Sequence, residues 1–417
     1  MPVILAALVL LSASALAQEK RLWVLRASGE LVEYDLATFT VKQTVKLPAE
    51  ALESPQSIQV TRLGQVLFVP ALSLPLADSD LKSPHTVWLW NGHEAITLDL
   101  GVKREVGQTG SNQLVTESAP TVFLSVDGAH LYWFSNEQRR LQREGIDLSV
   151  DTTWQAWRTD LNGNGREDVA SLKLPECNCP TGACEESCPI GTVWARANGI
   201  GDFFLVTQFV AGKDQLAYKA TTEYRQQSGK WIATALPEPL PRVLDANSNG
   251  DVIVEAIPDT GCCGWENQSD DQTLVLAAGK KQTVFDELAT YKNPDYDVSF
   301  YTSNAHLSAD EKSVAMTIVA TAQVNQPIQL ADQGQANPEE SKQIRRSLEE
   351  LPAVDAKTIE DPPRRIAFVP HATLIGWTNN KELLIVEDHL LVLYNVGTGA
   401  KRRLNVRVDS ADRIFLR

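Results

Sequence analysis

The stretch from residue 160 to 168, DLNGNGRED, carries oxygen-bearing groups at a spacing that suits a calcium ion. Gly165 stands at the sixth place of this stretch, where a calcium loop must turn sharply. The oxygen ligands would come from every second residue, namely Asp160, Asn162, Asn164, Arg166 through its backbone carbonyl, and Asp168. The spacing therefore predicts a loop that wraps one calcium ion.

The end of the same stretch departs from a complete calcium loop. Ser171 stands at the twelfth place, where a glutamate would supply two oxygens, so we expect a weak Kd of about 0.1 to 1 mM. The pattern resembles the loops of EF-hand-like and integrin-type propeller repeats, which implies a structural ion and no catalytic one. The alternative is a polar turn without an ion, because Asp and Asn readily bond their own backbone. A similar phrase at Asp245, DANSNGDVI, has no carboxylate at the ninth place and is interpreted as a turn only.

The six cysteines fall in two short stretches, a loop at 176–189 and the phrase DTGCCGWENQ. Closely spaced thiolates could bind zinc or an iron–sulfur cluster. An even count in an exported chain favours disulfides instead. A bond between two adjacent cysteines would be strained, so we expect each to pair with the other group. The candidates are Cys177, Cys179, Cys184, Cys188, Cys262 and Cys263.

Known catalytic patterns are missing from the sequence. There is no G-x-S-x-G, no H-E-x-x-H, no P-loop and no dinucleotide glycine motif. The six histidines, His306 among them, are scattered singly. Tryptophans such as Trp133, Trp154 and Trp157 fall at strand positions, and we expect them to fill the core between sheets rather than to form a sugar platform.

The elements around these residues are short strands in a repeated order. A strand, a tight polar turn and a second strand recur around Gly64, Gly128, Gly250, Asp310 and Asn380. A second phrase, in which an aromatic residue precedes a polar turn, recurs between them, as in ELVEYDLAT and LLVLYNVGT. The two phrases together make a four-stranded unit, which predicts an all-β fold, a single β-propeller of about seven four-stranded blades. The expected units are 20–52, 55–103, 118–175, 190–238, 240–289, 296–370 and 371–406.

The first unit is one strand short, and the last residues, 411–417 (ADRIFLR), form a spare strand. Pairing the spare strand into the first unit would close the ring and remove two exposed sheet edges. We therefore expect the two ends of the chain to share one sheet.

The phrases LSVDGAHLYW, LSADEKSVAM, EYDLAT and LYNVGTG resemble those of secreted bacterial propellers of the TolB-like and WD-repeat-like groups. The resemblance covers nearly the whole chain after residue 17. It implies the propeller fold but no particular activity, because such propellers include scaffolds, ligand binders and enzymes.

One segment interrupts the repeats at about 325–363. Within it, NPEESKQIRRSLEELP predicts a helix with Asn337 as N-cap, Pro338 in the first turn and an apolar stripe at Ile344, Leu348 and Leu351. We interpret it as a surface insertion docked by that stripe, with a lid or partner-binding arm as the alternative.

The N-terminus and the charge indicate where the protein works. Residues 1–17 join a short apolar run to small residues before Gln18, which predicts a cleaved signal peptide and a mature chain, 18–417, that is periplasmic or secreted. No other segment is apolar enough to span a membrane. The formal net charge of -15 opposes nucleic acid as a partner.

These observations predict a monomeric binding or interaction module for a protein or a small ligand, with calcium as the one candidate cofactor and no catalytic residue identified. The alternatives are an enzyme, a lyase or hydrolase, with its site at the central channel of the propeller, and a purely structural component of the cell envelope.

Overall fold

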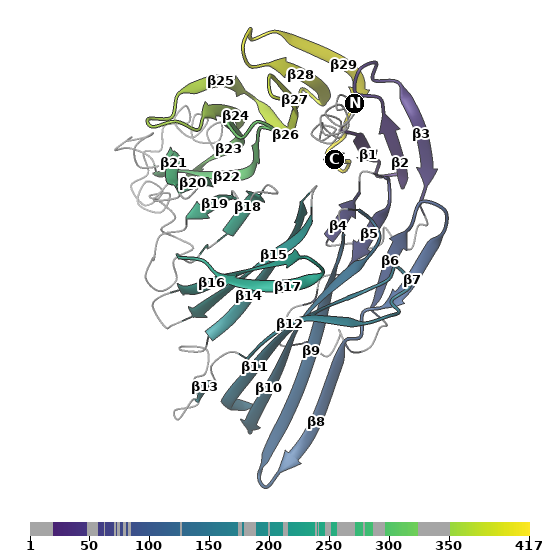
Figure 1. The fold of residues 1–417 in the computed structure, drawn as a ribbon, viewed down its shortest axis with the longest axis vertical. Helices are drawn as coiled ribbons and strands as arrows, with labels where there is room; N and C mark the ends of the chain where they lie inside the picture. The colour runs from purple at the N-terminus through teal and green to yellow at the C-terminus, as the bar shows by residue number, and fades with distance from the viewer. Residues whose placement is uncertain are drawn as a thin grey trace, which may run out of the picture.

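The computed structural model of the chain is a ring of antiparallel β-sheets (Figure 1). It describes residues 20–417 except 48–56, 62, 71, 73–75, 78–80, 82–84, 126, 174–176, 179–188, 199–200, 212–215, 238–239, 241, 247–251, 257–271, 278–279, 287–296 and 324–350. These described residues contain no helix, and hence none that is long and apolar enough to cross a membrane. The expected all-β class is confirmed.

The described strands form seven sheets, which follow one another around the ring in chain order (Figure 1). The first comprises β1 (Leu22–Leu25), β2 (Glu30–Tyr34), β3 (Val41–Lys46) and β30 (Arg413–Leu416). The second comprises β4 (Ser57–Val60), β5 (Val66–Val69), β6 (Thr86–Trp90) and β7 (Ala95–Asp99). The third comprises β8 (Lys103–Thr109), β9 (Asn112–Leu124), β10 (Leu131–Arg143), β11 (Ile146–Thr159), β12 (Glu167–Lys173) and β13 (Cys177–Asn178).

The remaining four sheets each contain four strands that are consecutive in the chain. They are β14 (Pro189–Asn198), β15 (Gly201–Ala211), β16 (Leu216–Gln227) and β17 (Lys230–Ala235); β18 (Arg242–Ala246), β19 (Val252–Ala256), β20 (Gln272–Ala277) and β21 (Lys280–Asp286); β22 (Asp297–Leu307), β23 (Ser313–Gln323), β24 (Leu351–Thr358) and β25 (Arg365–Pro370); and β26 (Ala372–Asn379), β27 (Glu382–Glu387), β28 (Leu390–Asn395) and β29 (Lys401–Arg407).

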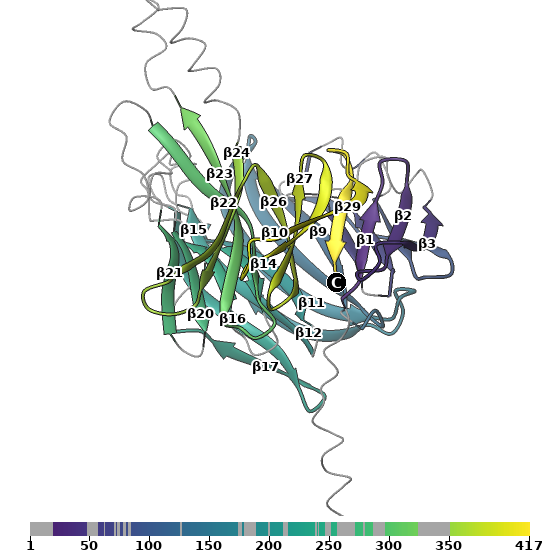
Figure 2. The same ribbon diagram turned by 90° about the horizontal axis from the view of Figure 1, so that it is seen from above.

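The two ends of the chain share the first sheet, as the spare strand predicted. β30 pairs antiparallel with β1, so that Leu22 lies opposite Leu416 and Leu25 opposite Arg413. Beyond these strands, the backbones of Arg21 and Arg417 exchange two hydrogen bonds. Viewed from above, this closed sheet lies beside the β26–β29 sheet along one flank of the ring (Figure 2).

The third sheet is larger than its predicted unit of 118–175. β8 and the first part of β9 lie before residue 118, and β13 adds a short pairing to β11. The hairpins of β8–β11 extend beyond the rest of the ring (Figure 1). The extension comes from the length of three strands, because β9 and β10 each have 13 residues and β11 has 14.

The apolar core is distributed between successive sheets. Strands such as β1 (LWVL) and β5 (VLFV) are buried on both faces, which explains their solidly apolar sequences. One such cluster joins the second and third sheets through Leu67, Leu89, Val122 and Leu131. The ring is therefore held by layers of side chains, each shared by two neighbouring sheets.

Two turn glycines show why the recurring phrase needs them. Gly64 and Gly128 have φ angles of 81° and 67°, a region that side chains disfavour. A Cβ on Gly64 would collide with Trp23, and one on Gly128 with Gln65. Each colliding side chain belongs to the preceding sheet, so the glycines let neighbouring sheets approach closely.

The insertion is shorter than predicted. Leu351, which we assigned to the apolar stripe of a helix, instead begins β24, and that strand continues through Thr358. Its β-branched and small residues pair with β23, so sheet formation prevails over helix propensity at this point. The rest of the predicted helix, residues 337–350, lies outside the described residues, as do residues 1–17 of the predicted signal peptide.

Candidate functional site

The predicted calcium loop connects β11 to β12 and is a tight turn organised by Asp160. The carboxylate of Asp160 accepts hydrogen bonds from the backbone N–H groups of Asn162, at 2.9 Å, and Asn164, at 2.8 Å. The Asp160 N–H donates to the carbonyl of Asn164 at 2.9 Å. Gly163 and Gly165 adopt φ angles of 79° and 68°. The loop therefore has a local reason for its Asp, Asn and Gly residues, which is the backbone bonding of a turn.

The other predicted carboxylate ligand, Asp168, lies at the start of β12 and bonds to a cation. Its Oδ1 accepts a hydrogen bond from Nε of Arg166 at 2.9 Å, and its side chain is 77% exposed. The Arg166 guanidinium also lies 4.4 Å from the ring centroid of Trp157. Within the described residues, no group of three His, Cys, Asp or Glu side chains could hold a metal. A calcium ion would have to take Asp168 from Arg166, and the calcium site stays a prediction.

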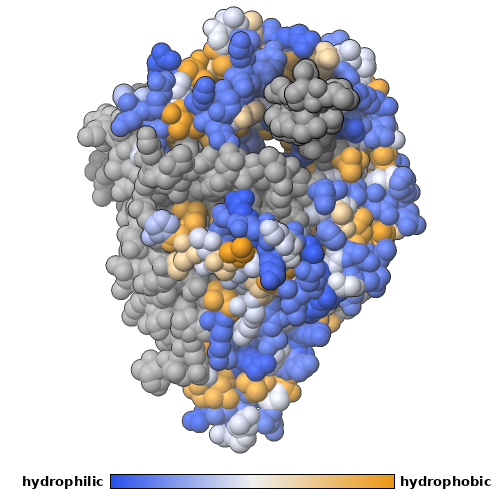
Figure 3. All heavy atoms as spheres, in the orientation of Figure 1, coloured by the Kyte–Doolittle hydropathy of each residue, from blue (hydrophilic) through white to orange (hydrophobic). Residues whose placement is uncertain are grey.

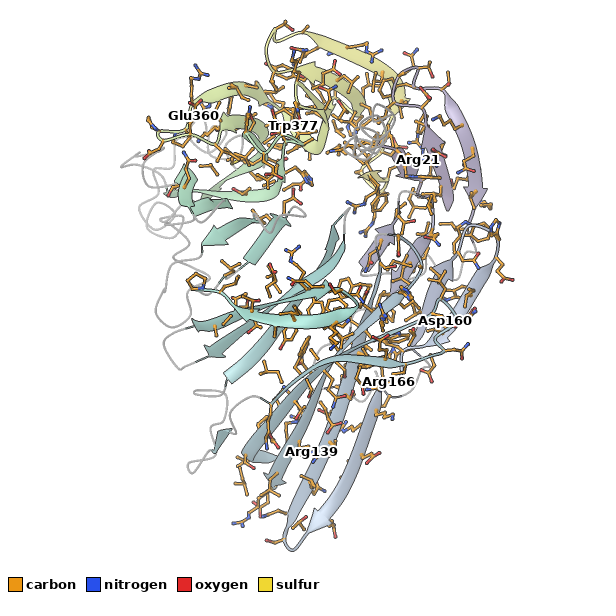
Figure 4. All side chains as sticks on the ribbon, viewed as in Figure 1. Arg21, Arg139, Asp160, Arg166, Glu360 and Trp377 are labelled. Atoms are coloured by element: carbon orange, nitrogen blue, oxygen red, sulfur yellow. The ribbon has the colours of Figure 1, made fainter. Side chains whose placement is uncertain are left out.

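This loop forms one wall of a cleft on the third sheet. Gly163 reaches toward the second sheet, where a Cβ on it would lie 3.4 Å from Leu98, and Leu161 packs into the core between the two sheets. The cleft has a volume of about 400 Å³, at the lower end of the range typical of small-molecule sites. A second wall includes the end of β7 and the start of β8, with Asp99 and Lys103, and Lys103 lies directly opposite Ser118 of β9. Figure 4 shows Asp160 and Arg166 on one side of the ring, well away from Trp377.

Two tryptophans form the inner floor of the cleft. Trp133 and Trp157 are directly opposite each other on β10 and β11, and their rings are nearly parallel, with centroids 6.1 Å apart. Nε1 of Trp133 donates to the hydroxyl of Thr159 at 2.9 Å, which fixes the orientation of the buried ring. The predicted core role is correct for Trp133 and Trp154, both buried. Trp157 is only partly buried and also lines the cleft, which its strand position alone did not reveal.

The outer floor of the cleft is polar. The hydroxyl oxygens of Ser118 and Ser135 are 2.8 Å apart, and Gln155 lies opposite Ser135 on the neighbouring strand. Glu137 also lines the cleft, and its carboxylate is 3.0 Å from the guanidinium of Arg139. An aromatic inner end beside a hydroxyl- and amide-lined outer end suits a ligand that has both a ring and hydrogen-bonding groups.

The middle of the ring presents a second combination of titratable groups. Nδ1 of His306 on β22 lies 3.5 Å from Oδ2 of Asp245 on β18. The ammonium group of Lys20 donates a hydrogen bond to the Trp377 carbonyl at 2.7 Å. Lys20 is also near enough to Asp245 for the carboxylate to influence the pKa of Lys20. Burial lowers the pKa of Lys20 below its usual range, while Asp245 acts in the opposite sense.

Asp245 also has a structural role that other residues share. Its Oδ2 accepts the backbone N–H of Leu307 in the next sheet at 3.1 Å. Gln59 on β4 and Asn304 on β22 likewise bond to the backbone of the neighbouring sheet. Asp245 therefore belongs to a repeated set of links between sheets, which is a sufficient reason for a polar residue at this position.

The far end of the third sheet carries exposed apolar residues. Val106, Leu114 and Ile146 are 58%, 37% and 50% exposed. Figure 3 shows an apolar group at the end of the molecule where the hairpins of β8–β11 terminate. Val106 pairs with Val115 and therefore faces the side of the sheet opposite to Leu114, so these residues do not form one contact surface.

The predicted disulfides fall mostly on residues that the structure does not describe. Cys177 begins β13 and pairs through its backbone with Val150. The other five, Cys179, Cys184, Cys188, Cys262 and Cys263, lie outside the described residues, so their pairing stays a prediction.

No protein family and no curated protein matches the chain in sequence. Among solved structures, it is similar to dipeptidyl peptidase 4 of Porphyromonas gingivalis, with a TM-score of 0.40, 8% identity, and coverage of 91% of this chain and 57% of that one. It is also similar to apo AztD of Citrobacter koseri, with a TM-score of 0.39, 7% identity, and coverage of 95% and 97%. The chain thus spans little more than half of the peptidase. Likeness at these scores carries no inference about activity.

Proposed function

We propose that the protein is a small-ligand-binding module, exported to the periplasm or the exterior, which binds its ligand in the cleft on the third sheet. The observation that carries this proposal is the convergence of Trp157, Arg166 and the Ser118–Ser135 hydroxyls on one cavity of about 400 Å³. An aromatic surface with a few directed polar groups is the usual composition of a small-molecule site. Packing of the two tryptophans into the core does not by itself require the polar side chains Ser118, Ser135 and Gln155 beside them.

The test is a thermal-shift screen of the mature chain against a library of small metabolites, followed by calorimetry on any compound that raises the Tm. Trp157→Phe should weaken binding about tenfold, because it reduces the aromatic surface in contact with the ligand. The matched control is Trp90→Phe, because Trp90 is partly buried on the other side of the second sheet and does not line the cleft.

Two results would contradict the proposal. One is a screen in which no compound raises the Tm of the wild-type chain. The other is a bound compound whose affinity is unchanged by Trp157→Phe and reduced by Trp90→Phe, since this would place the ligand away from the cleft.

An enzyme at the centre of the ring is the second candidate, and it depends on the proximity of His306 to Asp245. A carboxylate that orients a histidine is a common arrangement for proton transfer. Turnover of chromogenic ester or glycoside substrates that disappears in His306→Ala, with the Tm retained, would favour this candidate. We favour the binding module because Asp245 is already used in linking two sheets.

A further inference from the structure

Arg166 is held by two weak partners at the rim of the cleft. Its guanidinium lies over Trp157 on one side and bonds to Asp168 on the other. The side chains of Arg166 and Asp168 are 53% and 77% exposed, and an ion pair that faces water this openly is easily exchanged. Arg166 lines the cleft, whereas Asp168 does not. A ligand can therefore reach the guanidinium from the cleft and compete with Asp168 for it.

The charged groups that line the cleft are not equally available to a ligand. Oδ1 of Asp99 accepts the backbone N–H of Gly101 at 2.9 Å, and Glu137 is paired with Arg139. Lys103, on the same wall as Asp99, makes no ion pair within the described part of the chain. Lys103 is therefore the cationic lining residue without an ion-pair partner in this part of the chain, and Arg166, whose partner Asp168 is 77% exposed and outside the lining, is the second cation that a ligand can reach.

We propose that the ligand of this cleft is a small organic anion with a ring, whose ring contacts the part of Trp157 that Arg166 and Trp133 leave open to the cleft and whose carboxylate replaces Asp168 at Arg166. The inference rests on the proposed function, because it assigns a ligand class to the same cleft. A guanidinium binds a carboxylate through directed, charge-assisted hydrogen bonds, which gives such an anion an advantage over its uncharged counterpart. Lys103 on β8, directly opposite Ser118, adds a second positive charge to the lining of the cleft.

Two kinds of ring would satisfy this chemistry. A sugar acid would place its C–H groups beside Trp157 and its hydroxyls on Ser118, Ser135 and Gln155. An aromatic acid would use the tryptophan more fully and the hydroxyls less. The carboxylate is common to both, and the experiment distinguishes the rings.

The test is calorimetry on the mature chain with glucuronate and indole-3-acetate, each compared with its uncharged counterpart, glucose and indole-3-acetamide. At least one acid should bind, about tenfold or more tightly than its counterpart, because it gains charge-assisted hydrogen bonds. Whichever acid binds identifies the ring class. No heat from either acid, or equal affinity for an acid and its counterpart, would overturn the inference.

A pair of variants makes the test specific for the exchange at Arg166. Arg166→Gln should weaken binding of the acid about tenfold or more, since it removes the guanidinium. Asp168→Asn should strengthen binding of the acid severalfold, because it removes the internal competitor of the ligand. Effects in the same direction, or none, would overturn the inference. Both residues are exposed, and an unchanged Tm in each variant confirms that the fold is intact.

Failure of the organic-anion assignment can be distinguished from failure of the cleft as a binding site. An uncharged compound from the screen whose binding depends on Trp157 would retain the cleft as a binding site and would overturn only the assignment to organic anions.

Discussion

Leu22 and Leu416 lie directly opposite each other in the antiparallel pair β1–β30, so the two ends of the chain close the ring within one sheet. Ile414, Phe415 and Leu416 are partly buried, and Ile414 and Leu416 pack against the core between this sheet and the β26–β29 sheet. The closing strand thus supplies apolar contacts as well as backbone hydrogen bonds.

Deletion of residues 411–417 should therefore destabilise the protein sharply. The loss of three large apolar side chains should lower the free energy of unfolding by roughly 4 kcal/mol or more. Thermal and urea unfolding of the mature chain, with and without these residues, measure the change. A truncated chain that melts at the same temperature as the intact one would show that ring closure contributes little.

Acidification should remove a second stabilising interaction at the junction of β1 and β30, that of the Asp412 carboxylate. Asp412 bonds to Arg26 at 2.6 Å and accepts the N–H groups of Ala27 and Asp409. Although burial would raise the pKa of Asp412, these hydrogen bonds, led by that from the Asp409 amide, leave it below its usual range. A carboxyl with a lowered folded-state pKa stabilises the fold above its unfolded pKa of about 3.9 and loses this effect as the pH falls further.

We thus expect Asp412→Asn to cost about 1 to 2 kcal/mol of unfolding free energy at pH 7, because a charge-assisted hydrogen bond is lost. The difference from wild type should shrink as the pH falls below about 4. Urea unfolding of both proteins from pH 3 to pH 7 provides the comparison. A difference that stays constant over this range would exclude ionised Asp412 as the cause.

The repeat was predictable from the sequence because each strand–turn–strand phrase is local. The turns at Gly64 and Gly128 and the spare C-terminal strand all lie where the phrases placed them. The cleft was not predictable, because Arg166 and Trp157 meet across a turn. Lys103 lies on β8, far from both residues in the sequence. Nothing in the local sequence tells which side chains of two sheets will face each other.

The buried charge of the third sheet could not be predicted from the sequence either. Glu117 on β9 is fully buried, and its carboxylate lies 2.5 Å from Arg140 and 3.3 Å from Arg104. In the sequence, these three residues look like ordinary polar positions on the exposed face of a sheet. The burial of Glu117 between two partly buried arginines is a property of the tertiary structure.

Glu117→Gln should cost about 2 to 4 kcal/mol of unfolding free energy, because it removes the fully buried negative charge that Arg104 and Arg140 share, although Arg140 keeps Asp147 at 3.6 Å. Glu137→Gln is the matched control, since the carboxylate of Glu137 lies on the same sheet but is 35% exposed. Its cost should stay below about 1 kcal/mol. Equal effects of the two substitutions, measured by urea unfolding, would contradict a special role for the buried carboxylate.

We predict that the six cysteines are oxidised, because the export predicted from residues 1–17 would place them where disulfides form. Alkylation of the denatured, unreduced protein should label few or no thiols in the mass spectrum. Treatment with a reductant beforehand should then expose all of them. Full labelling without reductant, or zinc that remains bound through dialysis, would contradict the disulfide prediction.

Calcium bound in the Asp160 loop should stabilise the fold measurably. If Asp160 and Asp168 bind the ion with a Kd of about 0.5 mM, 5 mM calcium should stabilise the fold by about 1.4 kcal/mol, with a matching rise in Tm. Asp160→Ala combined with Asp168→Ala should abolish this rise. Arg166→Ala should increase it, because Arg166 would contribute only its backbone carbonyl to the ion while its side chain competes for Asp168. A response to calcium that is absent, or identical in all three proteins, would mean that Asp160 serves the turn alone.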